Sequence, residues 1–325
     1  MTERVETVGA GEWNDLLDRS GQATPFHLAE CLEQCARTVD ARLHRYVGYK
    51  GQEPTGLFPV LERRRGAVAA ALSPAPGVVP YGGPALLAPD GLKRRKRERW
   101  NRSFVDSVLE RVEEDVDPDY CRVRTGPAFT DERPFIWNGF DATVRHTYVV
   151  DLPEDETALD DRLDEQEDAT RDRVTVEETD AGALDDVLGL VADSRAEQGL
   201  SLDLDPALVR GLYRTLPEGC MRVYACRDGD RLLGGDVTLE LGDTVYSWLG
   251  AGDRSTDVPV NDLLYDNLLR DACRRGYARY DMLGTGEPRV FGARSAVGAE
   301  LRSYVRLVRG GPVGRLAARL SWLAP

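Results

Sequence analysis

Two stretches of the sequence share one pattern, and this pattern decides the fold. LHRYVGYKGQEPTGLFPVLE (residues 43–62) and MRVYACRDGDRLLGGDVTLE (residues 221–240) lie 178 residues apart. Each predicts a strand, a glycine-containing turn and a second strand, as in a β-hairpin. The turn glycine of the first stretch, Gly51, recurs at the same offset as Gly229. We therefore interpret the stretches as parts of an internal repeat.

The segments around both stretches follow the same order. Apolar residues at helical spacing predict helices at 12–18, 28–36, 94–112, 184–197, 206–215 and 261–275. Further strands are expected at 67–72, 120–124, 143–150, 244–251, 277–282 and 301–308. Hairpins followed by a crossover helix predict an α+β protein with two similar halves, each a mixed, mostly antiparallel sheet flanked by helices. We place the domains at residues 1–150 and 151–310, followed by an amphipathic tail at 311–325.

The composition describes a globular chain. It has 325 residues, 42% hydrophobic and 30% charged, which is long enough for two domains and too apolar for disorder. No stretch predicts a signal sequence or a membrane span, so we expect a cytoplasmic protein. The six cysteines are scattered and predict buried thiols rather than a disulfide framework.

The charges are unusual. The net charge is −14, and only three of the 42 Lys and Arg residues are Lys (Lys50, Lys93 and Lys96). This combination is typical of proteins from halophilic organisms, which keep molar salt inside the cell. There, a carboxylate-rich surface keeps the chain solvated, so the acidity does not indicate a partner.

Three segments of the second half have residue types suited to chemistry. Asp281 ends a predicted strand just before Gly284, where a carboxylate can contact a ligand or accept a proton; an ordinary turn aspartate is the alternative. Asn261 and Asp262 open a predicted helix, either at an anion site or as its cap. Tyr246 and Trp248 are expected on one strand face, lining a pocket or the core.

The motifs together resemble the Fem-type branch of the Gcn5-related N-acyltransferase (GNAT) superfamily. The resemblance rests on TPFH (24–27), PYGGP (80–84), Asn261, Asp281-x-x-Gly284 and the segment 293–301. It implies two tandem acetyltransferase-like domains and a transferase that moves an acyl or aminoacyl group to an amine or hydroxyl of an envelope or polysaccharide precursor. The implied donor is acyl-CoA or an aminoacyl-tRNA, and the implied acceptor is a small molecule or is linked to a lipid or sugar.

The resemblance also suggests roles for particular residues. Asp281 is expected to accept the proton of the acceptor amine or to orient the acceptor, and Arg294 to counter negative charge. The expected substrate-binding residues are Tyr246, Trp248, Asn261, Asp262, Gly284 and Tyr81. Arg294 replaces the lysine of the family motif and cannot act as a base. A catalytically silent GNAT-fold binding module is therefore the alternative function.

Two basic or amphipathic segments indicate other partners. Residues 93–97 (KRRKR) open a predicted helix and favour contact with an anionic membrane surface or RNA, or a solvated helix end. They leave open an adaptor function and peripheral membrane association. The tail at 311–325 is expected to rest on its own domain or on a membrane. His27, Cys31 and Cys35 span ~12 Å on a helix, too far for one ion, so no metal site is expected.

Overall fold

The chain forms two compact units in the computed structural model. The first unit comprises residues 1–145, 203–215 and 303–325, and the second unit comprises residues 146–202 and 216–302. The structure describes residues 2, 4–88, 91–154, 156–160, 173–197, 199, 204–283, 298–312, 314 and 316.

The sheet of the first unit has the order β1-β2-β3-β4-β6-β13, with the short strand β5 also paired to β3. Its strands are β1 (Arg4–Thr7), β2 (Arg42–Lys50), β3 (Glu53–Arg65), β4 (Val68–Ser73), β5 (Ala85–Leu86), β6 (Tyr120–Arg124) and β13 (Glu300–Gly310). Neighbouring strands are antiparallel except β4 and β6, which are parallel.

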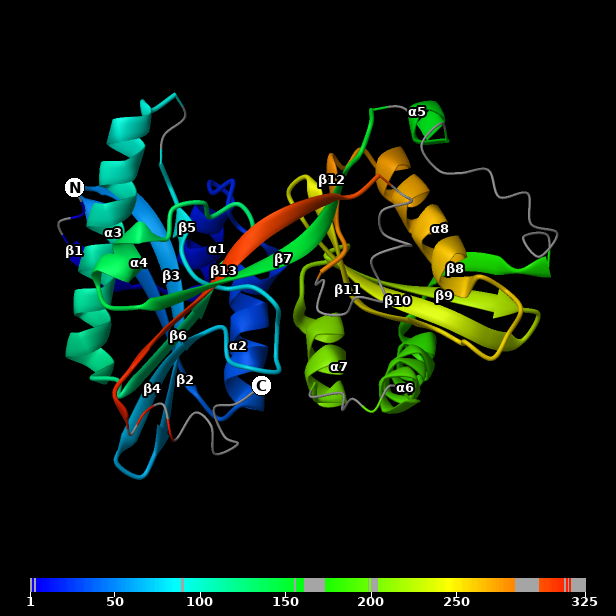
Figure 1. The fold of residues 1–325 in the computed structure, drawn as a ribbon, viewed down its shortest axis with the longest axis horizontal. Helices are drawn as coiled ribbons and strands as arrows, with labels where there is room; N and C mark the ends of the chain where they lie inside the picture. Colours follow the sequence, from blue (N-terminus) through cyan, green and yellow to red (C-terminus); the bar gives the residue numbers. More distant parts are fainter. Residues whose placement is uncertain are drawn as a thin grey trace. The chain divides into compact units, whose positions relative to one another are not determined.

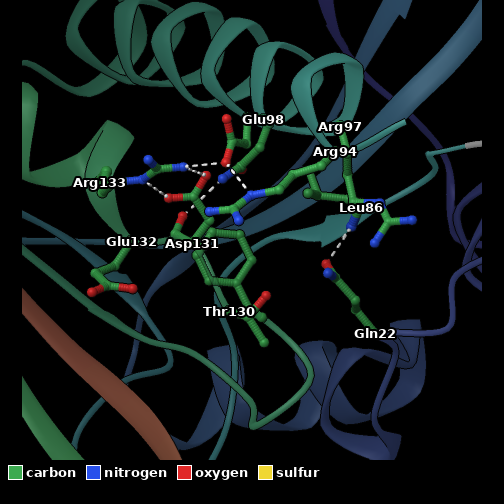
Figure 2. A pocket seen from close by; sticks show the side chains of 11 residues that line it. Gln22, Leu86, Arg94, Arg97, Glu98, Thr130, Asp131, Glu132 and Arg133 are labelled. Carbon is green, nitrogen blue, oxygen red and sulfur yellow. Dashed lines mark hydrogen bonds and ion pairs between the residues drawn. The ribbon is translucent and has the colours of Figure 1, made fainter. Parts of the chain in front are cut away.

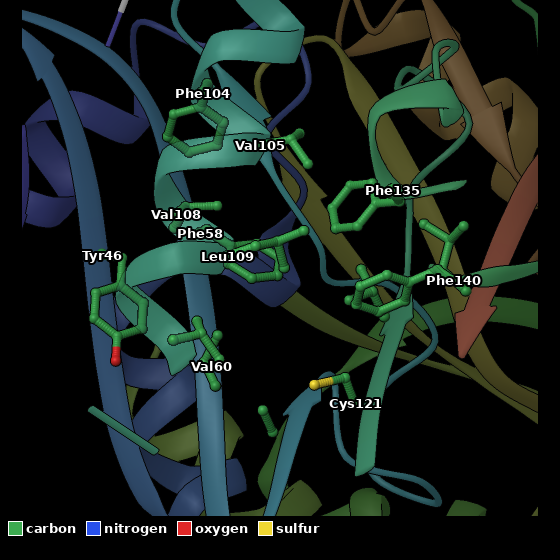
Figure 3. Packing of buried hydrophobic residues seen from close by; sticks show 14 of the residues in the cluster. Tyr46, Phe58, Val60, Phe104, Val105, Val108, Leu109, Cys121, Phe135 and Phe140 are labelled. Atoms are coloured by element: carbon green, nitrogen blue, oxygen red, sulfur yellow. The ribbon is translucent and has the colours of Figure 1, made fainter. Parts of the chain in front are cut away.

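Helices cover both faces of this sheet (Figure 1). The helices of the first unit are α1 (Ala10–Leu17), η1 (Pro25–His27), α2 (Ala29–Thr38), α3 (Arg94–Val116), α4 (Arg133–Trp137) and α7 (Pro206–Thr215). One face packs on α3, where Phe104 and Val108 lie over Phe58 and Val60 in a buried cluster (Figure 3). The other face packs on α1 and α2. Gly48 of β2 lets α3 approach the sheet closely, because a Cβ atom at this position would lie 2.8 Å from the Phe104 ring.

The second unit repeats this arrangement in the order β8-β9-β10-β11-β12-β7. Its elements are β7 (Asp141–Asp151), α5 (Glu156–Asp160), β8 (Thr175–Thr179), α6 (Ala181–Glu197), β9 (Met221–Asp228), β10 (Arg231–Leu241), β11 (Thr244–Gly252), α8 (Val260–Arg274) and β12 (Arg279–Asp281). Only β11 and β12 are parallel. On β10, Gly234 lies against Val260 of α8 and Gly235 against Val187 of α6, so both helices approach closely.

The two sheets therefore have the same strand order and the same pairing directions. The agreement extends to the turns: Gly51 and Gly229 have φ angles of 59° and 57°, which glycine adopts without strain. It also extends to the β-bulges, because the register of each hairpin shifts at one residue, Thr55 in the first and Leu233 in the second. The predicted fold class, two α+β units with mixed, mostly antiparallel sheets, is confirmed.

The sequence predicts that the last strand of each half, at 143–150 and at 301–308, joins the sheet of its own half. This expectation is wrong. β13 follows β12 in the chain but pairs with β6 of the first unit, and β7 follows β6 but pairs with β12 of the second unit. The helix α7 also belongs to the first unit, where Gly211 lies against Gln34 of α2. Periodicity indicates that a strand forms but not which edge it joins. The predicted boundary at residues 150/151 remains a prediction about the duplicated halves.

Candidate functional site

Asp281 lies where two parallel strands of the second unit separate. It is the third and last residue of β12, and it pairs with Tyr246 of β11 on one side and Val149 of β7 on the other. β11 continues beyond this pair to Gly252. Ligands of α/β sheets bind beyond the carboxyl ends of parallel strands, so Asp281 has a suitable position for chemistry.

The Asp281 carboxylate is buried, at 2% exposure, and is held by donors. The Thr147 hydroxyl donates to Oδ1 at 2.5 Å, and the Leu283 backbone N–H donates to the same oxygen at 2.9 Å. Leu283 itself adopts a left-handed conformation with φ of 40°. These two donors fix the orientation of the carboxylate at the strand end.

Tyr246 is the neighbour of Asp281 and is also buried. Burial, followed by the negative charge of Asp281, raises the pKa of the Tyr246 hydroxyl well above its usual value. Tyr246 is therefore a neutral hydroxyl at physiological pH, able to donate a hydrogen bond. Trp248 is half-buried, and the register between β10 and β11 shifts there, so the strict alternation assumed for Tyr246 and Trp248 is interrupted.

The other predicted binding residues belong to α8, to the first unit or to the part of the chain outside the described residues. Asn261 and Asp262 are exposed in the first turn of α8, whose N-cap residue is Pro259. Tyr81 is a buried residue of the first unit, where its ring contacts Phe26 and Tyr304. Gly284 and Arg294 fall within residues 284–297, outside the described residues, so the expected proximity of Asp281 and Arg294 stays a prediction.

The corresponding strand ends of the first unit are occupied by the segment Tyr81–Gly83. The Gly82 N–H donates to the Arg124 carbonyl at 2.9 Å, and the Gly83 N–H donates to Ser73 Oγ at 2.9 Å. A Cβ atom on Gly82 would lie 2.7 Å from the Pro74 nitrogen, so only glycine fits there. Backbone therefore fills the position between β4 and β6.

His27 holds this segment in place. Its Nε2 lies 3.3 Å from the Gly83 carbonyl, and its Nδ1 accepts from the Thr24 N–H at 3.2 Å, an arrangement that fits the neutral Nε2–H tautomer. Burial lowers the pKa of His27 to about 4. A neutral histidine thus fixes the segment at physiological pH.

A buried ion cluster lies elsewhere in the second unit. Glu240 is 3% exposed; Arg275 donates to its two oxygens at 2.6 and 2.8 Å, and the Tyr277 hydroxyl donates at 2.6 Å. Arg222 adds an ion pair at 3.2 Å. This carboxylate is fully compensated, which is typical of a structural ion cluster rather than of a reacting group.

A pocket of about 570 Å³ lies at the start of α3 in the first unit (Figure 2). Arg94 and Arg97 of the predicted basic segment line it, beside an ion network in which Arg133 bridges Glu98 and Asp131. Residues 93–97 are all exposed. The basic segment is thus accessible to solvent, and the Arg94 charge is paired with Glu98.

The described residues contain no group of three or more His, Cys, Asp or Glu side chains that could hold a metal ion. All six cysteines are within the described residues, and each is a buried thiol, as predicted. Of the described helices, none combines the length and apolarity that crossing a membrane requires. Most of the tail at 311–325 lies outside the described residues.

Comparison with known proteins agrees with this geometry. Residues 159–289, which include Asp281, match the model of the acetyltransferase (GNAT) domain family. The chain resembles FemX at 11% identity and a TM-score of 0.69, covering 98% of this chain and 100% of that one. The chain has the tandem GNAT fold. The resemblance to the Fem-type branch of this acyltransferase superfamily is confirmed at the level of the fold.

Two further solved structures are similar to the chain. A tandem GNAT protein from the clavulanic acid biosynthesis pathway matches at 13% identity and a TM-score of 0.52, over 95% of this chain and 99% of its own. The C-terminal domain of a proposed lysylphosphatidylglycerol synthetase from Agrobacterium fabrum matches at 12% identity and a TM-score of 0.55, over 95% and 94%. No curated protein sequence matches the chain.

Sequence reasoning missed Thr147, which donates to Asp281. Thr147 lies on β7, the strand that the sequence assigned to the first half. No local pattern in the sequence predicts that β7 pairs with β12 of the second unit, so none predicts the contact of Thr147 with Asp281. A buried threonine in a predicted strand is otherwise an ordinary core residue.

Proposed function

We propose that the chain is an acyl- or aminoacyltransferase whose chemistry takes place in the second unit at Asp281. One observation carries the proposal: within a segment that matches the GNAT domain, a buried carboxylate is fixed by two donors where parallel strands separate. Acyl transfer to an amine needs an oriented proton acceptor in a site from which water is excluded. Asp281 meets both requirements.

The proposed reaction has defined bond changes. The acceptor amine attacks the carbonyl carbon of the donor, so a C–N bond forms and the C–S bond of acyl-CoA or the C–O bond of aminoacyl-tRNA breaks. The proton lost by the amine passes to the Asp281 carboxylate. The leaving thiolate or alkoxide takes up a proton, for which we propose the neutral hydroxyl of Tyr246, the cross-strand partner of Asp281, as the donor; Asp281 then returns its proton to Tyr246.

The remaining roles are part of the same proposal. Arg294 would counter the negative charge that develops on the carbonyl oxygen, as an electrostatic group that cannot lose its proton. Trp248, Asn261, Asp262 and Gly284 would contact the substrates. Tyr81, in the first unit, would act in substrate binding there.

The proposed acceptor is an envelope or polysaccharide precursor linked to a lipid or sugar. Two observations support it: the similarity of the fold to FemX and its similarity to a proposed lysylphosphatidylglycerol synthetase. We propose that the enzyme acts in the cytoplasm. Contact of the exposed segment 93–97 with anionic lipid would place it at the membrane surface.

The test measures product formation with both donor classes. Purified protein is incubated with acetyl-CoA or a mixture of aminoacyl-tRNAs and with amine or hydroxyl acceptors, including amino sugars, short amine-bearing peptides and phosphatidylglycerol vesicles. Acylated acceptor, detected by mass spectrometry, supports the proposal. Donor binding in calorimetry without turnover of any acceptor contradicts it and favours the silent binding module.

A second measurement tests Arg294. The Arg294→Ala protein is expected to lose about 10²- to 10³-fold in kcat, the usual cost of removing one oxyanion-stabilising group. Arg294→Lys, which keeps the charge, is the matched control and should recover part of the rate. Full activity of Arg294→Ala would contradict the electrostatic role.

A further inference from the structure

Two large apolar side chains are exposed on α4, the short helix that packs against α3. Trp137 is 59% exposed and Ile136 is 44% exposed, whereas Phe135 of the same helix is fully buried. Adjacent exposed apolar residues beside charged ones are typical of an interaction surface. The packing of the first unit therefore does not explain why these two positions are apolar.

A strip of arginines on α3 leads to this apolar pair. Arg95, Arg99 and Arg102 are four and three residues apart, so they share one face of the helix, and all three are exposed. The strip ends beside α4, which lies against α3 (Figure 1). There, the guanidinium carbon of Arg102 lies 5.3 Å from the centroid of the Trp137 ring. We call these three arginines, together with Ile136 and Trp137, the α3–α4 surface.

The α3–α4 surface carries a net positive charge. Arg102 pairs with Asp106 at 3.4 Å, but among the described residues no carboxylate forms an ion pair with Arg95 or Arg99. The whole chain has a net charge of −14, so this surface is a basic region on an acidic protein. Its charge is complementary to an anionic partner rather than to a second copy of the chain.

The surroundings of Trp137 favour a lipid bilayer over a nucleic acid as this partner. The guanidinium groups of Arg102 and Arg133 both lie over the ring, at 5.3 and 5.8 Å from its centroid. A nucleobase would have to displace one of them to stack on the ring, and Ile136 offers no ring for stacking. Tryptophan beside an aliphatic residue is instead typical of the boundary between lipid headgroups and acyl chains, and arginine side chains extend from there to the phosphates.

We infer that the α3–α4 surface docks the first unit on an anionic lipid bilayer. Trp137 and Ile136 insert at the level of the headgroups, and the three arginines contact lipid phosphates. Binding of this kind increases with the buried apolar area and with the attraction to anionic lipids, and the surface supplies both. The inference rests on the lipid contact proposed above for residues 93–97 and adds the apolar anchor that this basic segment lacks.

The test sediments the full chain with vesicles of phosphatidylglycerol and phosphatidylcholine in equal parts, and with vesicles of phosphatidylcholine alone. Binding to the anionic vesicles is expected, weakened about fivefold in Arg99→Gln and about 25-fold in the double variant with Arg95→Gln, at about fivefold per basic residue. Arg37→Gln, which changes an exposed arginine of α2 on the other face of the sheet, should bind like wild type. No binding by wild type, or equal affinity of the double variant, would overturn the inference.

Substitutions of Trp137 separate the apolar anchor from the attraction between charges. Trp137→Ala should weaken binding to anionic vesicles about tenfold or more, because the ring no longer buries apolar area in the bilayer. Vesicles should also shift the tryptophan emission of wild type to shorter wavelength, and this shift should be absent in Trp137→Phe. An unchanged shift in Trp137→Phe would assign insertion to another tryptophan and overturn the inference.

Two further outcomes distinguish docking from other activities. Tighter binding to single-stranded polyuridine than to anionic vesicles would assign the α3–α4 surface to RNA and overturn the inference. Vesicle binding needs neither donor nor acceptor, so it is measured separately from acyl transfer. A protein that transfers acyl groups but does not bind vesicles overturns this inference alone, and one that binds vesicles without transfer contradicts the proposed function alone.

Discussion

The two units share one topology but differ in which charged side chains they bury and in the partners of those side chains. In the second unit, Glu240 is surrounded by Arg222, Arg275 and Tyr277, and Asp281 is held by Thr147. In the first unit, Arg122 takes the place of Asp281, and its neighbours carry the same charge. The backbone at this place is common to both, so the difference lies in side chains. The same backbone arrangement thus carries a buried carboxylate in one sheet and a buried guanidinium group in the other.

The strand ends differ as well. In the first unit, Tyr81–Gly83 fill the position between β4 and β6. In the second unit, the chain bends away after Asp281 through the left-handed residue Leu283. The strand ends are therefore closed by backbone in the first unit, and the variants below test whether Asp281 reacts in the second.

The largest effect is expected from Asp281→Asn. Removing the proton acceptor should lower kcat about 10²- to 10⁴-fold, the usual contribution of a general base, while the fold is retained. Steady-state transfer rates and circular dichroism check this. Asp243→Asn is the control, because Asp243 lies at the opposite end of the same strand pair, where it binds Arg279. An Asp281→Asn enzyme within threefold of wild type would exclude Asp281 as the base.

Glu240→Gln tests the paired cluster. The change leaves Arg275 and Arg222 without their buried carboxylate, so the free energy of unfolding should fall by about 3–5 kcal/mol in urea titrations. Glu178→Gln, which breaks an exposed pair to the same Arg222, should cost less than about 1 kcal/mol. An equal loss of stability in Glu240→Gln and Glu178→Gln would contradict the contrast between a buried and an exposed ion pair.

His27 predicts a pH dependence of the first unit. Its folded pKa of about 4 lies below the unfolded value of 6.5, so the unfolded chain binds the extra proton between these values. Stability from the neutral imidazole is present above pH 6.5 and is lost as pH falls to about 4, by about 3 kcal/mol. Urea unfolding from pH 7 to pH 4 should show a shallower loss in His27→Gln than in wild type.

Thr147→Val has the smallest expected effect. It keeps the shape of the side chain but removes one donor to Asp281, so stability should fall by about 1–3 kcal/mol and kcat by about tenfold. Thr147→Ser keeps the hydroxyl and should remain close to wild type in both measurements. A Thr147→Val protein indistinguishable from Thr147→Ser would show that the hydrogen bond does not orient the carboxylate.

The sequence predicted much of the fold because both hairpins carry their own local signals. Gly51 and Gly229 sit in the predicted turns, and the strands on either side have the expected pattern. It did not predict that β7 and β13 join the other sheet, because an extended segment can pair with either exposed edge. Asp281 was found from its strand-end position, whereas its donor Thr147 depends on the exchanged strand. Arg122 gave no signal, since an arginine in a strand predicts an exposed face and only the structure shows it buried.

The most direct test of the account is kcat for acyl transfer, measured side by side on wild type, Asp281→Asn and Asp243→Asn with one donor and one acceptor. We predict that kcat falls about 10²- to 10⁴-fold for Asp281→Asn alone and stays within twofold of wild type for Asp243→Asn. Equal rates for the three proteins, or an equal loss in both variants, would contradict the role of Asp281 as proton acceptor.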